Sequence, residues 1–523
     1  MSLHILLSFE GDKELDLSGV LPRGSKRSVS DQKRLSTLNK FVKRVLKSES
    51  FKGRSGEVLK IYLPDGFPSE SLIVLGLGPS ASFHPEVARI AAATARRRLP
   101  GALRGKKSSV LLHLDPERMT SAWSGRKKKE DAGPSRQPIR ADFDFGDVVQ
   151  AVTEGWNLGG YAFVEYRSKS KRAASTDLQL GFLSTPKASA ALLKESVKRG
   201  EAVAEAVAFA RDLGNTPANV LNPAALAARA RSWAKQCGLQ CQVLDDKAIR
   251  RERMGALISV AKGSDSPPRF LVLKYTPTGG RRGKKPLILV GKAVTFDSGG
   301  LSIKPARGME DMKMDMAGGA AVLAALGAIA RIRPSTPVIG IIPCAENMIS
   351  GGATRPGDVV ESRAGLMIEV VNTDAEGRMI LADALDYSRR FNPRLVVDVA
   401  TLTGACVVAL GDIVSGMFAN DPEVAAELSR ASEASGELLW ELPLYEPYFG
   451  QIRSNTGDIK NSGGRGAGAI TAAAFLARFA EGLPWCHLDV AGTAWTGKDV
   501  GYKNRGATGF GVRLLVQLAL QAR

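Results

Sequence analysis

Four carboxylates lie at the ends of apolar, strand-like or helix-forming segments within residues 286–378, and two lysines lie in the same region. These six residues are Lys292, Asp297, Lys304, Asp315, Asp374 and Glu376. Burying four carboxylates is costly unless positive charge compensates them, and a divalent cation is the simplest compensation. Four negative charges exceed what one dication neutralises, and carboxylates can bridge two ions about 3.5–4 Å apart. The sequence therefore predicts a site for two metal ions.

The spacing and type of these residues indicate how metal ions would be held. Asp374 and Glu376 are two residues apart, so both side chains project from the same side of the backbone if the preceding extended conformation continues. One ion could then take both carboxylates. Hard oxygen ligands favour Mn or Mg and still admit Zn or Co, so ligand type alone does not select the metal.

The segments around this cluster alternate between two kinds. Apolar, strand-like runs occur at 270–275, 286–291, 337–343, 366–371 and 394–400. Alanine-rich, helix-forming runs occur at 318–332, 381–391 and 467–480. This alternation is typical of a large α/β domain with a central, mostly parallel sheet, in which ligands bind beyond the carboxyl ends of the strands.

The chain length of 523 residues indicates two domains, because single cores rarely grow beyond about 250–300 residues. Residues 1–188 contain further strand-like runs and are predicted to form a smaller, variable and basic α/β domain. A polar, Pro/Gly-punctuated stretch at about 119–140 is predicted to be an exposed insertion. Residues 189–213 are predicted to form a linker helix, and residues 214–523 the larger domain that carries the acidic cluster.

Positive charge is concentrated in the N-terminal part of the chain. The net charge is +19, and residues 1–200 hold 35 basic and 21 acidic residues, a net charge of +14. A solvated basic surface and a patch that binds nucleic acid or another polyanion both fit this balance. Aromatic residues are not interleaved with the basic runs, which weakens the version that binds single strands by base stacking.

Composition also restricts the location of the protein. No run reaches the eighteen or more uncharged apolar residues of a bilayer span, and the first residues turn acidic before a signal-peptide core could finish. The five cysteines form no CxxC pair, which argues against a disulfide framework and against a Cys-based zinc site. We therefore expect a cytoplasmic protein without a membrane segment.

Three motifs within residues 286–378 resemble those of the leucyl aminopeptidases, also called the cytosol aminopeptidase family. They are VGKAVTFDSGGLSIKP, MKMDMAGGAA and NTDAEGR. Further similar segments begin near residues 215, 344, 442, 485 and 506, so the resemblance covers roughly 213–523. It implies a metal-dependent exopeptidase whose catalytic domain occupies residues 214–523.

The resemblance also implies a role for each matching residue. It implies that a water or hydroxide between the metals is the nucleophile, that Lys304 stabilises the tetrahedral intermediate, and that Arg378 holds a bicarbonate ion which serves as the base. The implied ligands of the tightly bound metal are Lys292, Asp297, Asp315 and Glu376. The implied ligands of the exchangeable metal are Asp297, Asp374 (side chain and main-chain carbonyl) and Glu376.

The implied substrate is a short peptide with a free amino terminus. An amino terminus can bind the tight metal and Asp315 only at the end of a chain, so the site removes one residue at a time. The implied substrate-binding residues are Lys304, Met312, Asp315, Asn372, Thr401 and Gly404. Those around the first side chain are small or apolar, which favours leucine-like and methionine-like residues. The resemblance further implies a homohexamer.

A serine hydrolase is the rival hydrolytic interpretation. Residues Asp297 to Gly300 read DSGG, as in a serine-protease signature, but a nucleophilic Ser298 needs a histidine–acid pair. His487 is the only histidine in the C-terminal half and follows an apolar stretch, so we expect it in the core or at the edge of the site. From a different class, nucleic-acid binding through the basic N-terminal domain remains an alternative or additional function.

Overall fold

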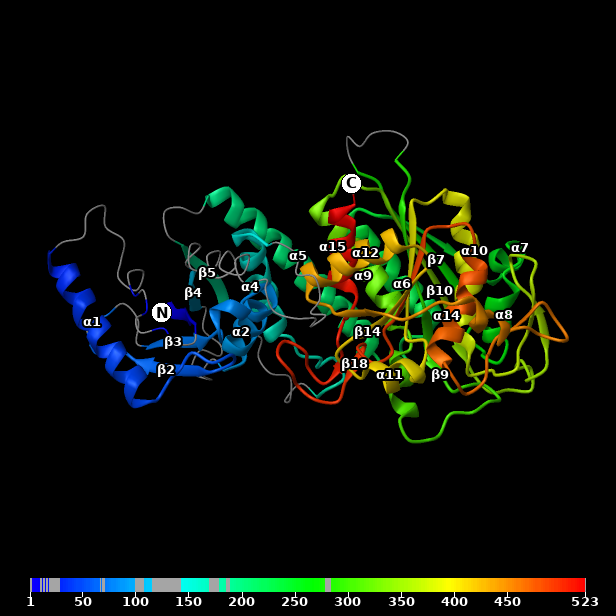
Figure 1. Cartoon of the computed structure of the whole chain (residues 1–523), viewed down its shortest axis with the longest axis horizontal. Helices are drawn as coiled ribbons and strands as arrows, with labels where there is room; N and C mark the ends of the chain where they lie inside the picture. The colour runs from blue at the N-terminus through cyan, green and yellow to red at the C-terminus, as the bar shows by residue number, and fades with distance from the viewer. Residues whose placement is uncertain are drawn as a thin grey trace. The chain divides into compact units, whose positions relative to one another are not determined.

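The computed structural model describes most of the chain. The described residues are 2–9, 12, 15, 17, 29–65, 67, 71–98, 108–114, 143–168, 178–184, 189–277 and 284–522. They divide into two compact units (Figure 1). Unit 1 contains the described residues up to Ala204 together with Val500–Lys503, and unit 2 contains those from Glu205 to Asp499 and from Asn504 onward. The predicted insertion at about 119–140 lies outside the described residues.

Unit 1 is built around a five-stranded sheet in the order β2-β3-β1-β4-β5. Neighbouring strands are parallel except for the pair β2 and β3. The strands are β1 (Ser2–Ser8), β2 (Val58–Tyr62), β3 (Ser71–Gly76), β4 (Ser108–Leu114) and β5 (Leu178–Ser184). The helices are α1 (Val29–Ser48), α2 (Pro85–Arg98), α4 (Phe145–Gly159) and the first part of α5 (Ala190–Asn215). The predicted α/β class of the N-terminal part is confirmed.

Unit 2 contains a nine-stranded, mostly parallel sheet in the order β15-β14-β17-β13-β8-β10-β7-β6, with β9 paired to β10. Its central strands are β8 (Leu287–Gly291), β9 (Ala293–Asp297), β10 (Val338–Asn347), β13 (Leu395–Ala400) and β17 (Trp485–Asp489). These five are mutually parallel where they pair. The outer strands are β6 (Gln240–Leu244), β7 (Arg269–Tyr275), β14 (Ser415–Ala419) and β15 (Leu439–Glu441). The predicted fold class is confirmed.

The central strands have the composition expected of a parallel sheet covered on both faces. Every residue of β8 and of β13 is buried. One face packs against α6 (Pro223–Cys237), α9 (Ala317–Ile332) and α12 (Pro422–Ser435), and α15 (Val512–Gln521) packs on α9 and α12 (Figure 1). The other face packs against α8 (Gly255–Ala261), α10 (Glu376–Ser388) and α14 (Gly468–Phe479).

Helix α9 and the short helix η5 (Met309–Met314) before it form the apolar segment Met309–Ile332. Among the described residues it is the single helical segment that is long and apolar enough to cross a membrane. Its most apolar window is 78% buried inside the structure, which is the expected environment of a core helix that covers the central sheet.

One predicted strand lies outside the central sheet. The run at 366–371 contains β12 (Met367–Glu369), which pairs with β11 (Val359–Glu361) and β16 (Ile459–Lys460) in a separate three-stranded sheet. The remaining short elements of unit 2 are α7 (Asp246–Arg251), α11 (Gly404–Leu410), α13 (Glu446–Gly450), β18 (Trp495–Thr496) and β19 (Gly506–Ala507).

The carboxyl ends of the parallel strands converge on the predicted site. Lys292 follows β8, Asp297 is the last residue of β9, and Thr401 follows β13. The strand pairing places Asn347, the last residue of β10, opposite Asp297. Residues that are distant in sequence therefore meet at one edge of the sheet, as expected for ligand sites of open α/β sheets.

Candidate metal centre

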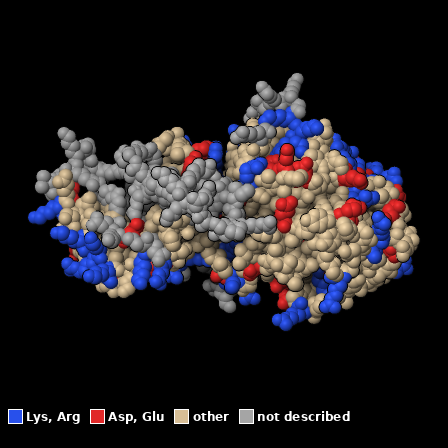
Figure 2. All heavy atoms as spheres, viewed as in Figure 1, with Lys and Arg blue, Asp and Glu red and all other residues tan. Residues whose placement is uncertain are grey.

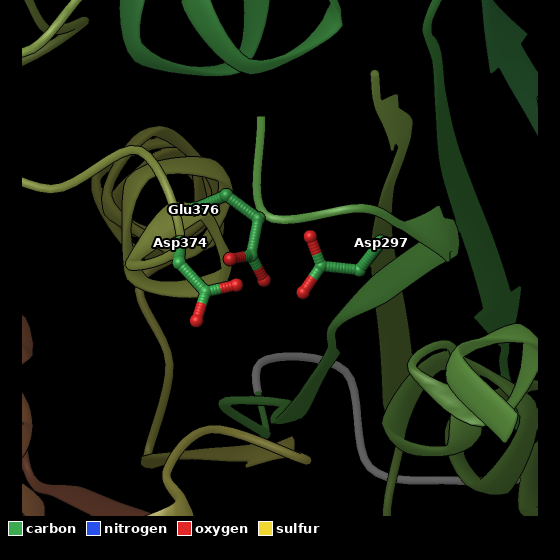
Figure 3. A group of neighbouring side chains, drawn as sticks. All are labelled: Asp297, Asp374 and Glu376. Atoms are coloured by element: carbon green, nitrogen blue, oxygen red, sulfur yellow. The ribbon is translucent and has the colours of Figure 1, made fainter. Parts of the chain in front are cut away.

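Three carboxylates point toward one another at this edge of the sheet (Figure 3). Asp297 comes from β9, Asp374 from the loop before α10, and Glu376 from the first residue of α10. One oxygen from each carboxylate lies within 4.8 Å of the other two. Asp297 and Glu376 are buried and Asp374 is half-buried, so the cluster is reached from one side.

The conformation of the loop differs from the predicted extended chain. The chain turns at Asp374, and helix α10 begins two residues later at Glu376. The turn is stabilised by Asn372, whose Oδ1 accepts the main-chain N–H of Asp374 at 2.9 Å and whose carbonyl accepts the N–H of Ala375 at 3.2 Å. The backbone between Asp374 and Glu376 is therefore not extended, as the predicted same-side projection required. The turn brings the carboxylates of Asp374 and Glu376 together instead.

Lys292 lies at the buried end of the cluster and is 2% exposed. Its Nζ is 2.8 Å from Asp315 Oδ1 and 2.8 Å from Glu376 Oε1, and it donates to the Thr401 carbonyl at 2.8 Å. A Cβ on Gly377 would lie 2.7 Å from both Cε and Nζ of Lys292. The glycine of NTDAEGR is therefore required so that the lysine can pass over the first turn of α10.

Asp315 joins the cluster through Lys292 and Thr401. The Thr401 hydroxyl donates to Asp315 Oδ1 at 2.7 Å. The second oxygen, Oδ2, is buried and has no hydrogen-bond partner among the described residues. Burial raises the pKa of the Asp315 carboxyl well above its ordinary value, and the positive charge of Lys292 offsets this only in part.

Lys304 lies at the more open side of the cluster. Its Nζ is 2.7 Å from Asp297 Oδ2 and 2.5 Å from Asp374 Oδ1. The preceding loop depends on Gly299, which has φ +86° and whose Cβ would lie 2.9 Å from Asp374 Oδ1. A side chain at Gly299 would therefore strain the loop and displace Asp374.

Arg378 approaches from the second residue after Glu376 and is almost completely buried. Its Nη1 donates to the Asn461 carbonyl at 2.8 Å, whereas its Nε has no hydrogen-bond partner among the described residues. Burial lowers the pKa of the guanidinium to about 10, although the charges of Glu376 and Asp489 oppose the shift. One guanidinium edge therefore remains able to donate to an anion.

Two other predicted substrate-binding residues lie on the elements around the cluster. Met312 lies in η5, where its carbonyl accepts the N–H of Asp315 at 3.3 Å. Gly404 is exposed at the start of α11, and a Cβ built there would meet no heavy atom of the described chain within 4 Å. The space beside Gly404 is open enough for a bound side chain.

Asn347 is a contact residue of the site that the sequence alone did not reveal. Its Nδ2 donates to Asp297 Oδ1 at 2.8 Å and to the Thr373 carbonyl at 3.0 Å. It therefore connects β9 to the loop that carries Asp374. The available signal was its position at the end of β10 within the segment CAENMISGG.

The geometry does not favour the serine-hydrolase alternative. The Ser298 hydroxyl donates to the Asn347 carbonyl at 2.7 Å. His487 is fully buried, and its Nδ1 is 2.6 Å from Asp398 Oδ1 on the neighbouring strand β13. The hydroxyl and the imidazole are thus engaged with different partners. Of the two places predicted for His487, the core and the edge of the site, the structure has it in the core.

The electrostatics of the cluster fit a bound cation. Burial raises the pKa values of the Asp297 and Asp374 carboxyls, and the like charges of neighbouring carboxylates raise them further. Burial alone lowers the pKa of Lys292, but the charges of Asp315, Glu376 and Asp297 raise it above its ordinary value. Carboxylates this close gain from any positive charge placed among them, and their oxygens suit Mn, Mg, Zn or Co.

Two family profiles match this chain. The profile described as the cytosol aminopeptidase family, catalytic domain, matches residues 208–516. The profile described as the cytosol aminopeptidase family, N-terminal domain, matches residues 19–130. The first match contains every residue of the candidate metal centre.

Individual relatives agree with the profiles over most of the chain. A protein of Syntrophotalea carbinolica named "Probable cytosol aminopeptidase" is 44% identical over 475 residues, which cover 91% of this chain and 90% of the relative. A protein of Geobacter sulfurreducens with the same name is 42% identical over 473 residues, which cover 90% and 89%. The solved structure "Bottromycin maturation enzyme BotP in complex with Mn" has a TM-score of 0.79 and 34% identity, and the match covers 99% of this chain and 98% of that one. The chain therefore belongs to the cytosol aminopeptidase family, whose members are metal-dependent peptidases that hydrolyse peptide bonds.

Proposed function

We propose that this protein releases single amino-terminal residues from short peptides and uses two divalent metal ions to do so. The observation that carries the proposal is the convergence of the Asp297, Asp374 and Glu376 carboxylates within 4.8 Å, beside two buried or half-buried lysines. A structural ion-pair cluster would not need a buried carboxylate oxygen without a partner, such as Asp315 Oδ2, at the edge of a sheet where ligands bind.

The residues divide into two overlapping ligand sets. The tightly bound ion would take Lys292, Asp297, Asp315 and Glu376. The exchangeable ion would take Asp297, Asp374, with its side chain and main-chain carbonyl, and Glu376. The free Oδ2 of Asp315 supports the first set. Zn or Mn are the proposed metals, with Mg or Co as alternatives, and the Mn in the structural neighbour favours Mn.

When bound, the divalent ions supply Lewis acidity, which polarises the scissile carbonyl and makes a water molecule acidic enough to attack at neutral pH. The chain positions both reactants. Lys304 is the most accessible cation of the cluster and would donate to the carbonyl oxygen as negative charge develops there. Its ammonium group pairs with Asp297 and Asp374, and it would exchange these carboxylates for the carbonyl oxygen when a metal ion takes its place beside them.

Arg378 would hold a bicarbonate ion that accepts the proton of the attacking water. A guanidinium can bind a planar anion through two parallel N–H groups, and Nε of Arg378 has no other partner among the described residues. Because the guanidinium is almost completely buried, a bound anion would also offset the cost of its desolvation.

The first side chain of the substrate would lie among Met312, Thr401 and Gly404, and its amino group beside Asp315. The open space at Gly404 and the apolar Met312 favour leucine-like and methionine-like residues. Asn372 would contact the peptide from the opposite loop. Only the first residue of a chain has a free amino group beside a scissile carbonyl, and binding of both groups would restrict the reaction to exopeptidase cleavage.

The proposal also includes the domain organisation, the oligomeric state and the location of the protein. We infer a cytoplasmic homohexamer with a basic N-terminal domain at residues 1–188, a linker helix at 189–213 and a catalytic domain at 214–523. The family assignment supports peptide hydrolysis and gives no support to nucleic-acid binding as a second function.

Product analysis tests the proposed reaction. The protein, loaded with Mn²⁺, is incubated with the tripeptide Leu-Gly-Gly and with its N-acetylated form, and the products are separated by mass. We expect free leucine from the first peptide and no cleavage of the second, because acetylation removes the amino group that the site must bind. Cleavage of the acetylated peptide, or an internal cut in a longer peptide, would contradict the proposal.

A further inference from the structure

Asn461 lies beside the loop that carries the metal ligands, yet none of its side-chain atoms belongs to either ligand set. It follows β16, and its main-chain N–H donates to the Glu369 carbonyl at 3.0 Å, which extends the pairing of β16 with β12 by one residue. Its side chain is completely buried. The chain of β12 has already left the sheet at this point and turns toward Asp374.

The side-chain amide of Asn461 replaces the missing strand partner. Its Oδ1 accepts the main-chain N–H groups of Val371 at 2.9 Å and of Asn372 at 3.2 Å. Its Nδ2 donates to the carbonyls of Asn372 at 2.7 Å and of Ala375 at 3.4 Å. An amide offers two acceptor lone pairs and two N–H groups, and all four are used here.

The main chain of Asn461 contacts the same region from its other side. Its carbonyl accepts the Arg378 Nη1 at 2.8 Å. Asn461 is therefore hydrogen-bonded to the main chain on both sides of Asp374 and to the guanidinium of Arg378. The other hydrogen bonds that fix this loop from outside meet at Thr373, which contacts Asn347, Ser302 and Gly299. Asn461 is the partner of the main chain on either side of it.

We propose that Asn461 is a positioning residue of the metal centre, which fixes the Val371–Ala375 loop so that Asp374 and Glu376 meet Asp297. The inference rests on the proposed two-metal site and adds a residue to its support. No other small side chain reproduces the four bonds. Aspartate would turn one carboxylate oxygen, in place of Nδ2, toward the carbonyls of Asn372 and Ala375, and alanine would leave two buried N–H groups without a partner.

Binding of Mn²⁺ alone tests this role. The metal-free protein and its Asn461→Ala variant are titrated with Mn²⁺, and the free ion is followed by electron paramagnetic resonance. We expect the affinity for the more weakly bound ion to fall about 10- to 100-fold, as when other groups that orient metal ligands are removed. The tightly bound ion, which Lys292 and Asp315 also hold, should be affected less.

Asn420→Ala is a control at a second bridging asparagine, which is exposed where Asn461 is buried. Asn420 also bridges main-chain groups, since its Oδ1 accepts the N–H of Trp485 and its Nδ2 donates to the Leu483 carbonyl. It lies at the opposite end of β17 from the metal centre. We expect it to leave both Mn²⁺ affinities unchanged, because a loss of stability alone does not discriminate between two neighbouring ions.

Asn461→Asp distinguishes the effect of a displaced loop on Mn²⁺ affinity from the effect of an added charge. It also replaces the alanine variant in this test if that variant does not fold. An added negative charge by itself would tighten Mn²⁺ binding, whereas a displaced loop weakens it, as in the alanine variant. Wild-type affinity for both ions in either variant, or tighter binding in the aspartate variant, would overturn the inference. Absence of Mn²⁺ binding by the wild-type protein would instead overturn the proposed metal site itself.

Discussion

At the scale of single residues, two ammonium groups and four carboxylates share one site, so a metal ion bound as proposed would compete with protons for the same atoms. Lys292 can ligate a cation only through the lone pair of its neutral amine. The carboxylates around it raise its pKa, which favours the ammonium form. Metal binding at this residue therefore requires the release of a proton, and the affinity for the tightly bound ion should rise with pH.

Lys292→Arg tests whether this nitrogen is a ligand. The substitution keeps the positive charge, but a guanidinium is not deprotonated in proteins and its larger head meets Gly377, where Lys292 is already in close contact. We expect loss of the tightly bound ion and of activity, measured by metal analysis after dialysis. Native content of both ions would show that Lys292 is an ion-pair partner and that another group completes the site.

Lys304→Ala should separate metal binding from turnover. Removal of the ammonium group that pairs with Asp297 and Asp374 leaves both carboxylates free for a cation, so Mn²⁺ affinity should be equal or higher. Turnover should fall about 10²- to 10³-fold, the usual effect of losing one donor to a developing oxyanion. Lys304→Arg, which keeps a donor, should lose less. A variant that loses metal together with activity would contradict this role.

The sequence predicted the charged residues of the site but not the groups that orient them. Their positions after apolar, strand-like segments placed Asp297, Asp374 and Glu376 at the ends of elements. The hydrogen bonds of Asn347 and Asn461 were not predicted. They join segments that are distant in sequence, and these segments meet only because particular strands pair, which no local sequence pattern specifies. The turn at Asp374 was missed because the Asn372 side chain competes with extended backbone for the same N–H.

At the scale of elements, helix α10 links the metal centre to the rest of unit 2. Its first residue is Glu376, and its interior contains the fully buried Asp383. The Asp383 carboxylate accepts the N–H of Leu257 from α8 and the N–H of Arg363 from the loop after β11, both at 2.8 Å. Asp383 therefore fixes α10 against its neighbours.

Asp383 should make stability depend on pH. Burial raises the pKa of its carboxyl to about 7, although the backbone N–H groups oppose the shift. The folded chain therefore retains a proton that the unfolded chain loses near pH 4, and the stability from this group is full below that pH and declines toward pH 7. Relative to Asp383→Asn, the wild type should lose stability as the pH rises. Its unfolding free energy minus that of the variant, measured with urea, should fall by about 1.4 kcal/mol per pH unit between pH 5 and 7.

An opposite slope would show that the backbone N–H groups stabilise the Asp383 anion more than burial penalises it. The assignment of α10 itself does not depend on this result, since the helix-forming run at 381–391 was predicted from the sequence. The pairing of the preceding β12 in a separate sheet was not predicted, because apolar content indicates a strand but not the sheet that it joins.

At the scale of the whole molecule, the basic charge has a clear location in unit 1. Helix α1 exposes Lys33, Arg34, Lys40, Lys43, Arg44 and Lys47. Figure 2 shows basic side chains gathered over this helix. The apolar side chains of α1, such as Leu38 and Val42, are buried in the core of unit 1. These six basic side chains account for part of the predicted basic character of residues 1–200, whereas the basic runs at residues 106–107 and 126–129 lie outside the described residues.

Peptide hydrolysis should not depend on this charge. The double variant Lys40→Glu/Arg44→Glu reverses two neighbouring charges on the exposed face of α1. We expect kcat/KM for a leucine peptide within about twofold of wild type, because salt screens exposed charges and the residues of the proposed site all belong to unit 2. If the helix also binds duplex DNA, wild-type affinity must fall steeply between 50 and 200 mM salt and the variant must bind more weakly. A large loss of peptide hydrolysis in the variant would contradict the prediction that hydrolysis is independent of the basic charge on α1.

The central claim is that hydrolysis requires two divalent ions held by the cluster of carboxylates around Asp297. The most direct test removes all metal with a chelator, returns Mn²⁺ in measured equivalents, and follows leucine release from Leu-Gly-Gly at each step. The account predicts negligible activity in the metal-free protein and a maximum when two ions are bound per chain. Undiminished hydrolysis by the metal-free protein, or a maximum with a single ion bound, would contradict it.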